Sequence, residues 1–140
     1  MALTIGDWKR LPDGPLRFAP FCVAHRDWIY QFAGWDTTSP TDIGTIFRAR
    51  VLADGSLTAW EHIGDMPNVG DSQTGVISGG YVYITAGEYT NNAAGLANAN
   101  LNIAKINEDG SLGPWRTDQK VPRSSTKPGL NTGVRRSRCW

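Results

Sequence analysis

Two segments of the chain carry the same short motif, and they decide the fold: Asp54-Gly-Ser-Leu-Thr-Ala-Trp60 and Asp109-Gly-Ser-Leu-Gly-Pro-Trp115. The two motifs lie 55 residues apart. A second match supports the first, because Val-Ala-His-Arg-Asp-Trp-Ile-Tyr-Gln-Phe-Ala-Gly at 23–34 aligns without gaps with Val-Ile-Ser-Gly-Gly-Tyr-Val-Tyr-Ile-Thr-Ala-Gly at 76–87. Duplication at this period indicates that one supersecondary unit is used twice.

The pattern within each unit is one of strands and turns. Each Asp-Gly pair lies between two apolar runs and supplies the positive φ that a tight hairpin turn requires. No stretch keeps apolar residues at helical spacing for three turns. We predict eight strands, near 17–24, 27–34, 45–52, 57–62, 73–78, 81–87, 101–107 and 112–116. Units of about 50 residues with these features are typical of β-propeller blades.

The predicted fold is therefore all-β, with two propeller blades of four antiparallel strands each. The predicted segments are a closing strand of a blade at 1–15, one blade at 16–63, a second at 64–116, and a basic tail that begins a third unit at 117–140. Gly34 and Gly87 end the second strands, where the missing β-carbon permits a bulge or a close pass by the neighbouring sheet. Each fourth strand is expected to end at its tryptophan, Trp60 or Trp115, which packs between blades.

Over residues 5–134 the chain resembles kelch-type β-propellers, in the subgroup whose blades carry an Asp-Gly-x-Leu-x-x-Trp turn. The resemblance implies blades with hydrophobic strands, a glycine closing the second strand and a tryptophan in the fourth. One feature departs from the kelch pattern, in which paired glycines usually end the second strand. Here Ala33-Gly34 and Ala86-Gly87 have a single glycine each.

Two blades are too few to close a propeller. A blade buries both of its faces against neighbours, and closed propellers have roughly 4 to 8 blades. Three copies of the chain would make a six-bladed ring, an arrangement that resembles the small fungal and bacterial fucose-binding lectins built from repeated blades. Alternatively, the chain is part of a longer propeller, or its β fold is not a propeller. These alternatives stay open from the sequence.

Charge is distributed unevenly along the chain, although its net value is only +1. Residues 1–115 carry seven Lys or Arg against twelve Asp or Glu, whereas residues 116–140 carry seven against one. The basic tail, which includes Arg135, Arg136 and Arg138, suits a solvated terminus or contact with an acidic surface. No aromatic residues are interleaved with these arginines, so nucleic acid is not an expected partner.

The sequence contains neither a membrane span nor a secretory signal. No apolar run reaches the roughly 20 residues that a spanning helix needs, and the first seven residues are too short and uncharged for a signal peptide. The resulting localisation is open, with a cell-exterior or virion-associated assembly favoured. The two cysteines, Cys22 and Cys139, allow at most one internal disulfide and match no metal site. Cys22 is predicted to be a buried thiol, and Cys139 is the better candidate for an intermolecular bond.

Residues suited to catalysis or metal binding are not recognisable. His25 and His62 each lack a second ligand at metal spacing and are expected at the surface or in turns. The loop carboxylates Asp36, Asp42 and Asp71 define no acid–base pair. The ligand set of the copper oxidases with kelch-like propellers is also missing. We therefore expect no enzyme, no metal and no cofactor.

Ligand binding is better supported, in the two long loops that follow the second strands. Stacking on an exposed aromatic ring together with amide and carboxylate hydrogen bonds is how shallow sites hold sugars. The candidate residues are Trp35, Asp36, Glu88, Tyr89, Asn91 and Asn92. The sequence thus favours a non-enzymatic propeller module that binds a glycan or a protein. The alternatives are a purely structural assembly protein and a fragment of a sugar-acid epimerase or lyase propeller.

Overall fold

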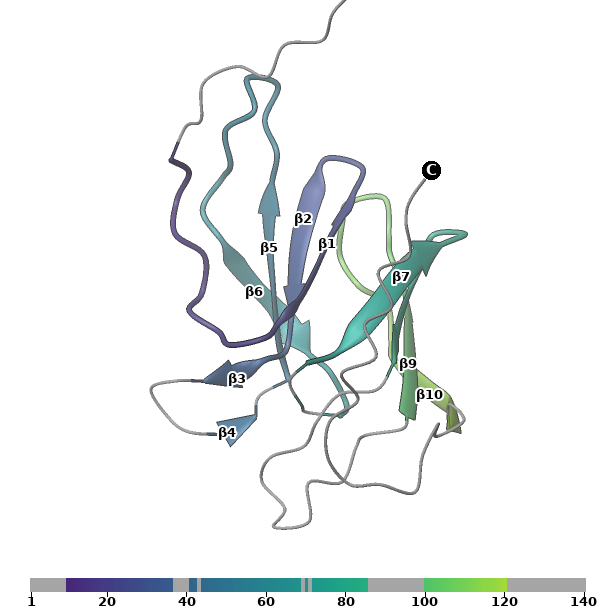
Figure 1. Ribbon diagram of the computed structural model, residues 1–140. Coiled ribbons are helices and arrows are strands. Elements are labelled where there is room, and N and C mark those ends of the chain that lie inside the picture. The colour runs from purple at the N-terminus through teal and green to yellow at the C-terminus, as the bar shows by residue number, and fades with distance from the viewer. Residues whose placement is uncertain are drawn as a thin grey trace, which may run out of the picture.

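The strands of this chain form two antiparallel sheets of four strands each (Figure 1). The computed structural model describes residues 10–36, 41–42, 44–68, 70, 72–85 and 100–120. Sheet 1 has the order β1 (Phe21–His25), β2 (Trp28–Phe32), β5 (Thr45–Arg50) and β6 (Glu61–Asp65). Sheet 2 has the order β7 (Thr74–Ser78), β8 (Tyr81–Thr85), β9 (Asn100–Lys105) and β10 (Arg116–Lys120). A two-stranded ribbon of β3 (Trp35–Asp36) and β4 (Thr41–Asp42) completes the described strands.

The predicted fold class is confirmed in its coarser form, all-β with two units of four antiparallel strands. The described residues contain no helix, and hence none long and apolar enough to cross a membrane. Each unit is a simple meander, because the order of strands in each sheet follows their order in the chain. The closing strand predicted near Trp8 and the third unit predicted after residue 117 lie largely or wholly outside the described residues.

Both Asp-Gly turns form as predicted and join the third strand of each sheet to the fourth. Gly55 and Gly110 have φ values of +80° and +79°, a backbone conformation that glycine adopts without steric cost. The β7–β8 hairpin uses Gly79 and Gly80, both with positive φ, in the same way. These turns match the right-handed twist of the flanking strands, and they set the pairing register.

The position predicted for both fourth strands is wrong. β6 and β10 begin immediately after Trp60 and Trp115, whereas the prediction of 57–62 and 112–116 placed each tryptophan at or near a strand end. Beside each turn the ladder makes one isolated bridge, Val51↔Leu57 in sheet 1 and Ile106↔Leu112 in sheet 2. The chain then leaves the ladder before it pairs again. In sheet 2 the interruption coincides with Gly113-Pro114, residue types that disfavour strand pairing, whereas in sheet 1 Thr58-Ala59 gives no such signal.

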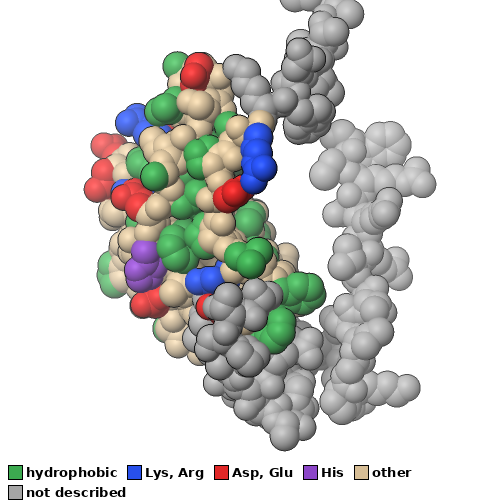
Figure 2. Space-filling model, turned by 90° about the vertical axis from the view of Figure 1, so that its left-hand side faces the viewer, with side chains coloured by type: hydrophobic (Ala, Val, Ile, Leu, Met, Phe, Trp, Pro, Cys, Tyr) green, Lys and Arg blue, Asp and Glu red, His purple; other side chains and the backbone are tan. Residues whose placement is uncertain are grey.

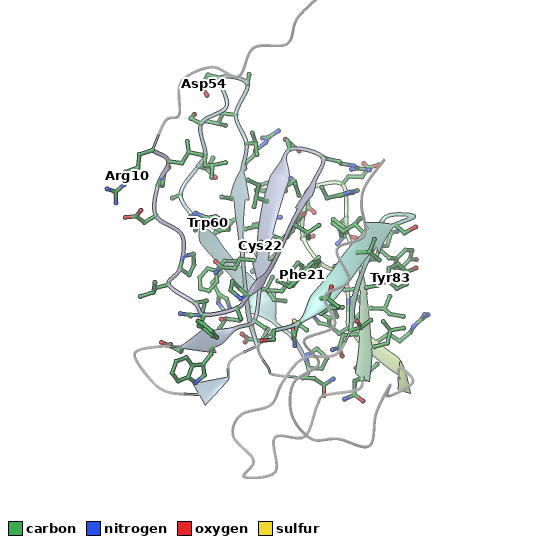
Figure 3. The ribbon with its side chains drawn as sticks, viewed as in Figure 1. Arg10, Phe21, Cys22, Asp54, Trp60 and Tyr83 are labelled. Atoms are coloured by element: carbon green, nitrogen blue, oxygen red, sulfur yellow. The ribbon has the colours of Figure 1, made fainter. Side chains whose placement is uncertain are left out.

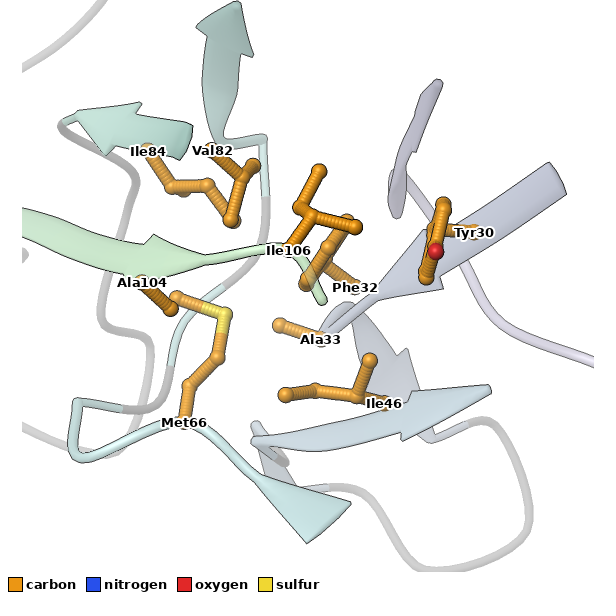
Figure 4. Close-up of a cluster of buried hydrophobic side chains, with 9 residues drawn as sticks. All are labelled: Tyr30, Phe32, Ala33, Ile46, Met66, Val82, Ile84, Ala104 and Ile106. Carbon is orange, nitrogen blue, oxygen red and sulfur yellow. The ribbon is translucent and has the colours of Figure 1, made fainter. Parts of the chain in front are cut away.

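The two sheets pack face to face around one hydrophobic core (Figure 4). Its buried members come from both sheets and from the linker between them: Tyr30, Phe32, Ala33, Ile46, Met66, Val82, Ile84, Ala104 and Ile106. Among the described strands, the backbones of the two sheets approach most closely at β1 and β7. Gly75 makes this approach possible, since a β-carbon there would lie 2.9 Å from the Phe21 ring.

The two repeats do not pack through equivalent faces. The face of sheet 1 that meets sheet 2 corresponds, in the repeat, to the face of sheet 2 that points away from sheet 1. On β2, Trp28, Tyr30 and Phe32 point toward sheet 2 and contribute to the core. Their counterparts in the repeat are Tyr81, Tyr83 and Thr85, which point away from sheet 1 because the alternate residues Val82 and Ile84 are the ones in the core. The aromatic face of sheet 1 therefore packs on the aliphatic face of sheet 2.

Polar contacts and aromatic rings fix this packing at the Asp109-Gly110 turn. The Tyr30 hydroxyl donates to the Gly110 carbonyl at 2.9 Å, and Arg48 Nη1 donates to the Asp109 carbonyl at 3.0 Å. The Trp115 ring meets Phe32 edge to face, with centroids 6.3 Å apart. The prediction that Trp115 packs between the two units is confirmed.

A segment without strand pairing, residues 10–17, lies on the side of sheet 1 away from sheet 2 (Figure 1). The Pro15 carbonyl accepts a hydrogen bond from Gln31 Nε2 at 3.2 Å. Gly14 contacts Trp60 closely, since a β-carbon there would lie 3.3 Å from the indole. Figure 2 shows this side of the molecule, where hydrophobic side chains are interspersed with acidic and basic ones. The first strand starts at Phe21, four residues later than predicted.

Candidate binding site

The candidate site begins where β2 ends and the backbone turns outward. Ala33 and Gly34 have positive φ values of 52° and 106°. A β-carbon on Gly34 would lie 3.0 Å from the Phe18 carbonyl oxygen. A close pass does occur at Gly34, but the segment that makes it is residues 17–20, which precede β1 in the same unit, and not the neighbouring sheet that was predicted. Its counterpart, Gly87, lies outside the described residues.

This turn delivers Trp35 to an aromatic pair with Phe18. The backbone N–H of each residue donates to the carbonyl of the other at 2.9 Å. Their rings meet edge to face, with centroids 6.3 Å apart and an interplanar angle of 84°. Phe18 is 61% exposed, whereas Trp35 is partly buried. The ring available to a ligand is thus mainly that of Phe18.

The second predicted residue of this loop, Asp36, faces the guanidinium of Arg17. Asp36 Oδ2 lies 3.7 Å from Arg17 Nη1, and the two side chains are only 19% and 15% exposed. The guanidinium also lies 5.8 Å from the centre of the Phe47 ring, within the range of a cation–π contact. We call Arg17, Phe18, Trp35 and Asp36 the β3 cluster. It combines an exposed ring with a charged pair that is mostly shielded from water.

Phe18 and Arg17 were not among the predicted site residues. The sequence placed both at the start of the first strand, and nothing in their own neighbourhood points to Trp35. The signal that relates them is a backbone bridge between residues 17 positions apart. Such a pairing is set by the tertiary fold, so local periodicity does not reveal it.

The remaining predicted ligand-binding residues, Glu88, Tyr89, Asn91 and Asn92, lie outside the described residues, as does Asp71. The strands that flank this loop are described. β8 ends at Thr85 and β9 begins at Asn100, at the same end of the molecule as β3 and β4, the lower end in Figure 1. Both predicted loops therefore leave the sheets from one end, which we call the loop end. The Asp-Gly turns lie at the other end.

One buried amide at the loop end is not satisfied. Gln73 immediately precedes β7 and is 8% exposed, yet neither its Oε1 nor its Nε2 has a hydrogen-bond partner. Its neighbour Ser72 donates its backbone N–H to the Ala19 carbonyl. Most buried amides in proteins are hydrogen bonded. The Gln73 amide therefore offers one free acceptor and one free donor group at the loop end.

The histidines and the described cysteine form no metal site. His62 Nε2 lies 3.2 Å from Asp65 Oδ1 on exposed β6, and His25 ends β1. Among the residues that the structure describes, no three His, Cys, Asp or Glu side chains gather as metal ligands. Cys22 is exposed, so the prediction of a buried thiol is wrong. Cys22 lies on the face of β1 that points away from the core, where desolvation of the sulfur by surrounding atoms still raises the pKa of the thiol.

Comparison with known protein families and with curated proteins finds no match for this chain.

Proposed function

We propose that the chain is a non-enzymatic, kelch-type propeller module that binds a glycan through its loop end. The observation that carries the proposal is the β3 cluster, in which the exposed Phe18 ring is held rigidly against Trp35 beside the Arg17–Asp36 pair. An aromatic surface next to fixed charged groups suits a ligand with an apolar sugar face and many hydroxyls. The module would be completed by copies of itself or by the rest of a longer chain.

Rigidity favours this role for the cluster. Two backbone hydrogen bonds join Phe18 to Trp35, and Gly34 allows the two segments to approach. A ring held in this way loses little conformational entropy when a ligand binds. The loop that contains Glu88, Tyr89, Asn91 and Asn92 starts from the same end and would add amide and carboxylate groups to the same ligand.

The direct test is glycan-array binding followed by titration of the best ligand. Phe18→Ala should weaken binding about tenfold, which corresponds to about 1.4 kcal/mol, and Tyr89→Ala should weaken it too. Leu16→Ala is the matched control, because Leu16 is 70% exposed in the same segment but outside the β3 cluster. Equal affinity in Phe18→Ala and Leu16→Ala would exclude the cluster as the site. A chain that binds no glycan on the array would rule out the glycan as ligand.

A second candidate function is that of a structural assembly protein. The observation in its favour is that Trp35 is partly buried and that Asp36 is engaged by Arg17, so both residues also serve to pack the loop onto sheet 1. If the role is structural, Trp35→Ala should lower the melting temperature, and no glycan on the array should bind the wild-type chain and the variant differently. For the glycan-binding role, Phe18→Ala should change affinity while thermal stability stays nearly constant, because Phe18 is largely exposed.

A further inference from the structure

We infer that the outer face of sheet 2 binds the outer face of sheet 1 in a second copy of this chain, in the same head-to-tail manner in which the two sheets bind within one chain. The inference rests on the propeller-like arrangement in the proposed function but not on its glycan ligand. We call the first surface the open face. Its residues are Val76, Tyr81, Tyr83, Leu101, Ile103 and Lys105, all on the side of sheet 2 away from the core.

The open face is largely apolar, and part of it is uncovered. Val76 is 56% exposed and Tyr81 is 41% exposed, whereas Tyr83 is partly buried and Ile103 is only 7% exposed. Val76, Tyr83 and Ile103 lie side by side on three neighbouring strands, because the register pairs each with the next. The rings of Tyr81 and Tyr83 lie 6.5 Å apart on the same strand. Exposed apolar residues near one another, here Val76 and Tyr81, are the usual mark of a surface that another protein covers.

The internal interface shows what fits such a face. Val76, Tyr81 and Tyr83 are the repeat counterparts of Val23, Trp28 and Tyr30 in sheet 1. Those three residues all contribute to the core between the sheets. The Asp109-Gly110 turn packs against Trp28 and Tyr30, and the Gly110 carbonyl accepts a hydrogen bond from the Tyr30 hydroxyl. The open face therefore presents the same type of surface, two aromatic residues and a valine, without its turn.

Sheet 1 carries the complementary surface at its outer side. Its Asp54-Gly55 turn is the counterpart of the docked turn, and the space around Gly55 is empty within 4 Å of a β-carbon. Figure 3 shows Asp54 at the tip of this turn and Tyr83 on the opposite sheet. Ala24 is exposed on the same side, as the counterpart of Ile77. In the proposed contact, Tyr83 takes the role of Tyr30 and the Gly55 carbonyl that of Gly110.

The segment at residues 10–17 leaves room for this contact. Leu11-Pro12 corresponds to Met66-Pro67 of the linker between the sheets. The segment bonds to sheet 1 through Pro15 and Gln31, just as the linker bonds to sheet 2 through Asn68 and Asn102. It therefore lies where a linker from a preceding sheet would lie. Met66 is 4% exposed and Leu11 is 37% exposed, which is the difference that a missing neighbouring sheet would produce.

A second copy is the occupant that these surfaces favour, because the chain carries both halves of the contact. The contact is heterologous, so repetition of it closes a ring when the rotation per copy allows. With two sheets in each copy, three copies give six sheets, which lies within the range of roughly 4 to 8 for closed propellers. Charge is compatible with this contact, since Lys105 on the open face and Asp54 at the tip of the turn are both exposed and carry opposite charges.

Mass in solution, measured by light scattering after size exclusion, tests the inference. The wild-type chain should have three times its monomer mass of 15.3 kDa. Tyr83→Arg blocks the open face and Ala24→Arg blocks the opposite surface, so each variant alone should be monomeric. Glu108→Arg is the control, because Glu108 is exposed on the docked turn and outside both surfaces. It should retain the wild-type mass. Circular dichroism checks that each variant is folded.

Mixing the two blocked variants separates a head-to-tail contact from any symmetric one. Each variant keeps one intact surface, so an equal mixture should form a species of twice the monomer mass. A wild-type chain that stays monomeric, a Tyr83→Arg variant with wild-type mass, or a mixture that stays monomeric would each overturn the inference. Failure of the glycan array leaves all of these masses unchanged, so the two proposals can fail independently.

Discussion

The two Asp-Gly-Ser-Leu turns have the same local structure in different surroundings. In both, the aspartate Oδ1 accepts hydrogen bonds from the backbone N–H and the hydroxyl of the serine two residues later. Gly55 and Gly110 have nearly the same φ. Yet Gly110 is buried beneath Trp28, whereas Gly55 is exposed. Local sequence therefore determines the conformation of the turn. The neighbouring sheet determines how strongly a substitution in the turn lowers the stability of the fold.

The largest expected effect comes from adding a side chain to the docked turn. In Gly110→Ala, the new β-carbon would lie 2.5 Å from Trp28 Nε1, and it would also occupy a positive φ. Overpacking and backbone strain together should cost about 3 kcal/mol. Gly55→Ala should cost only about 1 kcal/mol, from the positive φ alone. Urea unfolding of both variants in the Tyr83→Arg background measures the difference, and equal losses would contradict the assigned packing.

The next comparison uses the two tryptophans that follow the turns. Trp115 meets Phe32 across the core, so Trp115→Ala should cost about 3 kcal/mol, at the low end for an aromatic residue removed from a core. Trp60 contacts Gly14 and is not part of the core between the sheets, so Trp60→Ala should cost clearly less in the monomeric background. Thermal unfolding followed by circular dichroism gives the order of the two. The reverse order would show that the segment, rather than the sheet interface, stabilises the fold.

A smaller effect is expected from the two tyrosine hydroxyls. Tyr30→Phe removes the bond to the Gly110 carbonyl and should cost about 1 kcal/mol. Tyr83→Phe should leave the stability of the isolated chain unchanged within about 0.5 kcal/mol, as is usual for a change at the surface. If copies associate as inferred, Tyr83→Phe should instead weaken association. Chemical denaturation and concentration-dependent mass distinguish these two outcomes.

The smallest effect is a dependence on pH from the turn aspartates. Hydrogen bonds from the Ser111 hydroxyl and N–H, with a contribution from Arg48, lower the pKa of Asp109. Ser56 lowers the pKa of Asp54 in the same way, without an arginine. Because each folded pKa lies below its unfolded value of about 3.9, the stabilisation is present above that value and is lost as pH falls through the folded pKa. Asp109→Asn should flatten the acid limb of the melting temperature more than Asp54→Asn.

Particular residues show why the sequence predicted some features and missed others. Gly55 and Gly110 were predicted correctly because a positive φ restricts the residue type at its own position. A close approach at Gly34 was also predicted, but the approaching segment, residues 17–20, is not the sheet that was expected. Cys22 was predicted buried and is exposed, because an apolar strand does not reveal which of its faces has a neighbour. Phe18 was assigned to a strand, although its partner Trp35 is reached only through a bridge between distant segments.

The sequence by itself determined the two units of four antiparallel strands and the conformation of both Asp-Gly turns, because these depend on alternation and on contacts between nearby residues. It did not predict the two-stranded sheet of β3 and β4, which lies in a segment assigned to a loop. Only the tertiary structure decided which faces meet, where β6 and β10 begin after their tryptophans, and that Phe18 covers Trp35. The physical reason is that the two repeats have almost the same local preferences. Their differences arise from packing, since sheet 1 has sheet 2 on its aromatic face, whereas the described residues place no second sheet on the corresponding face of sheet 2.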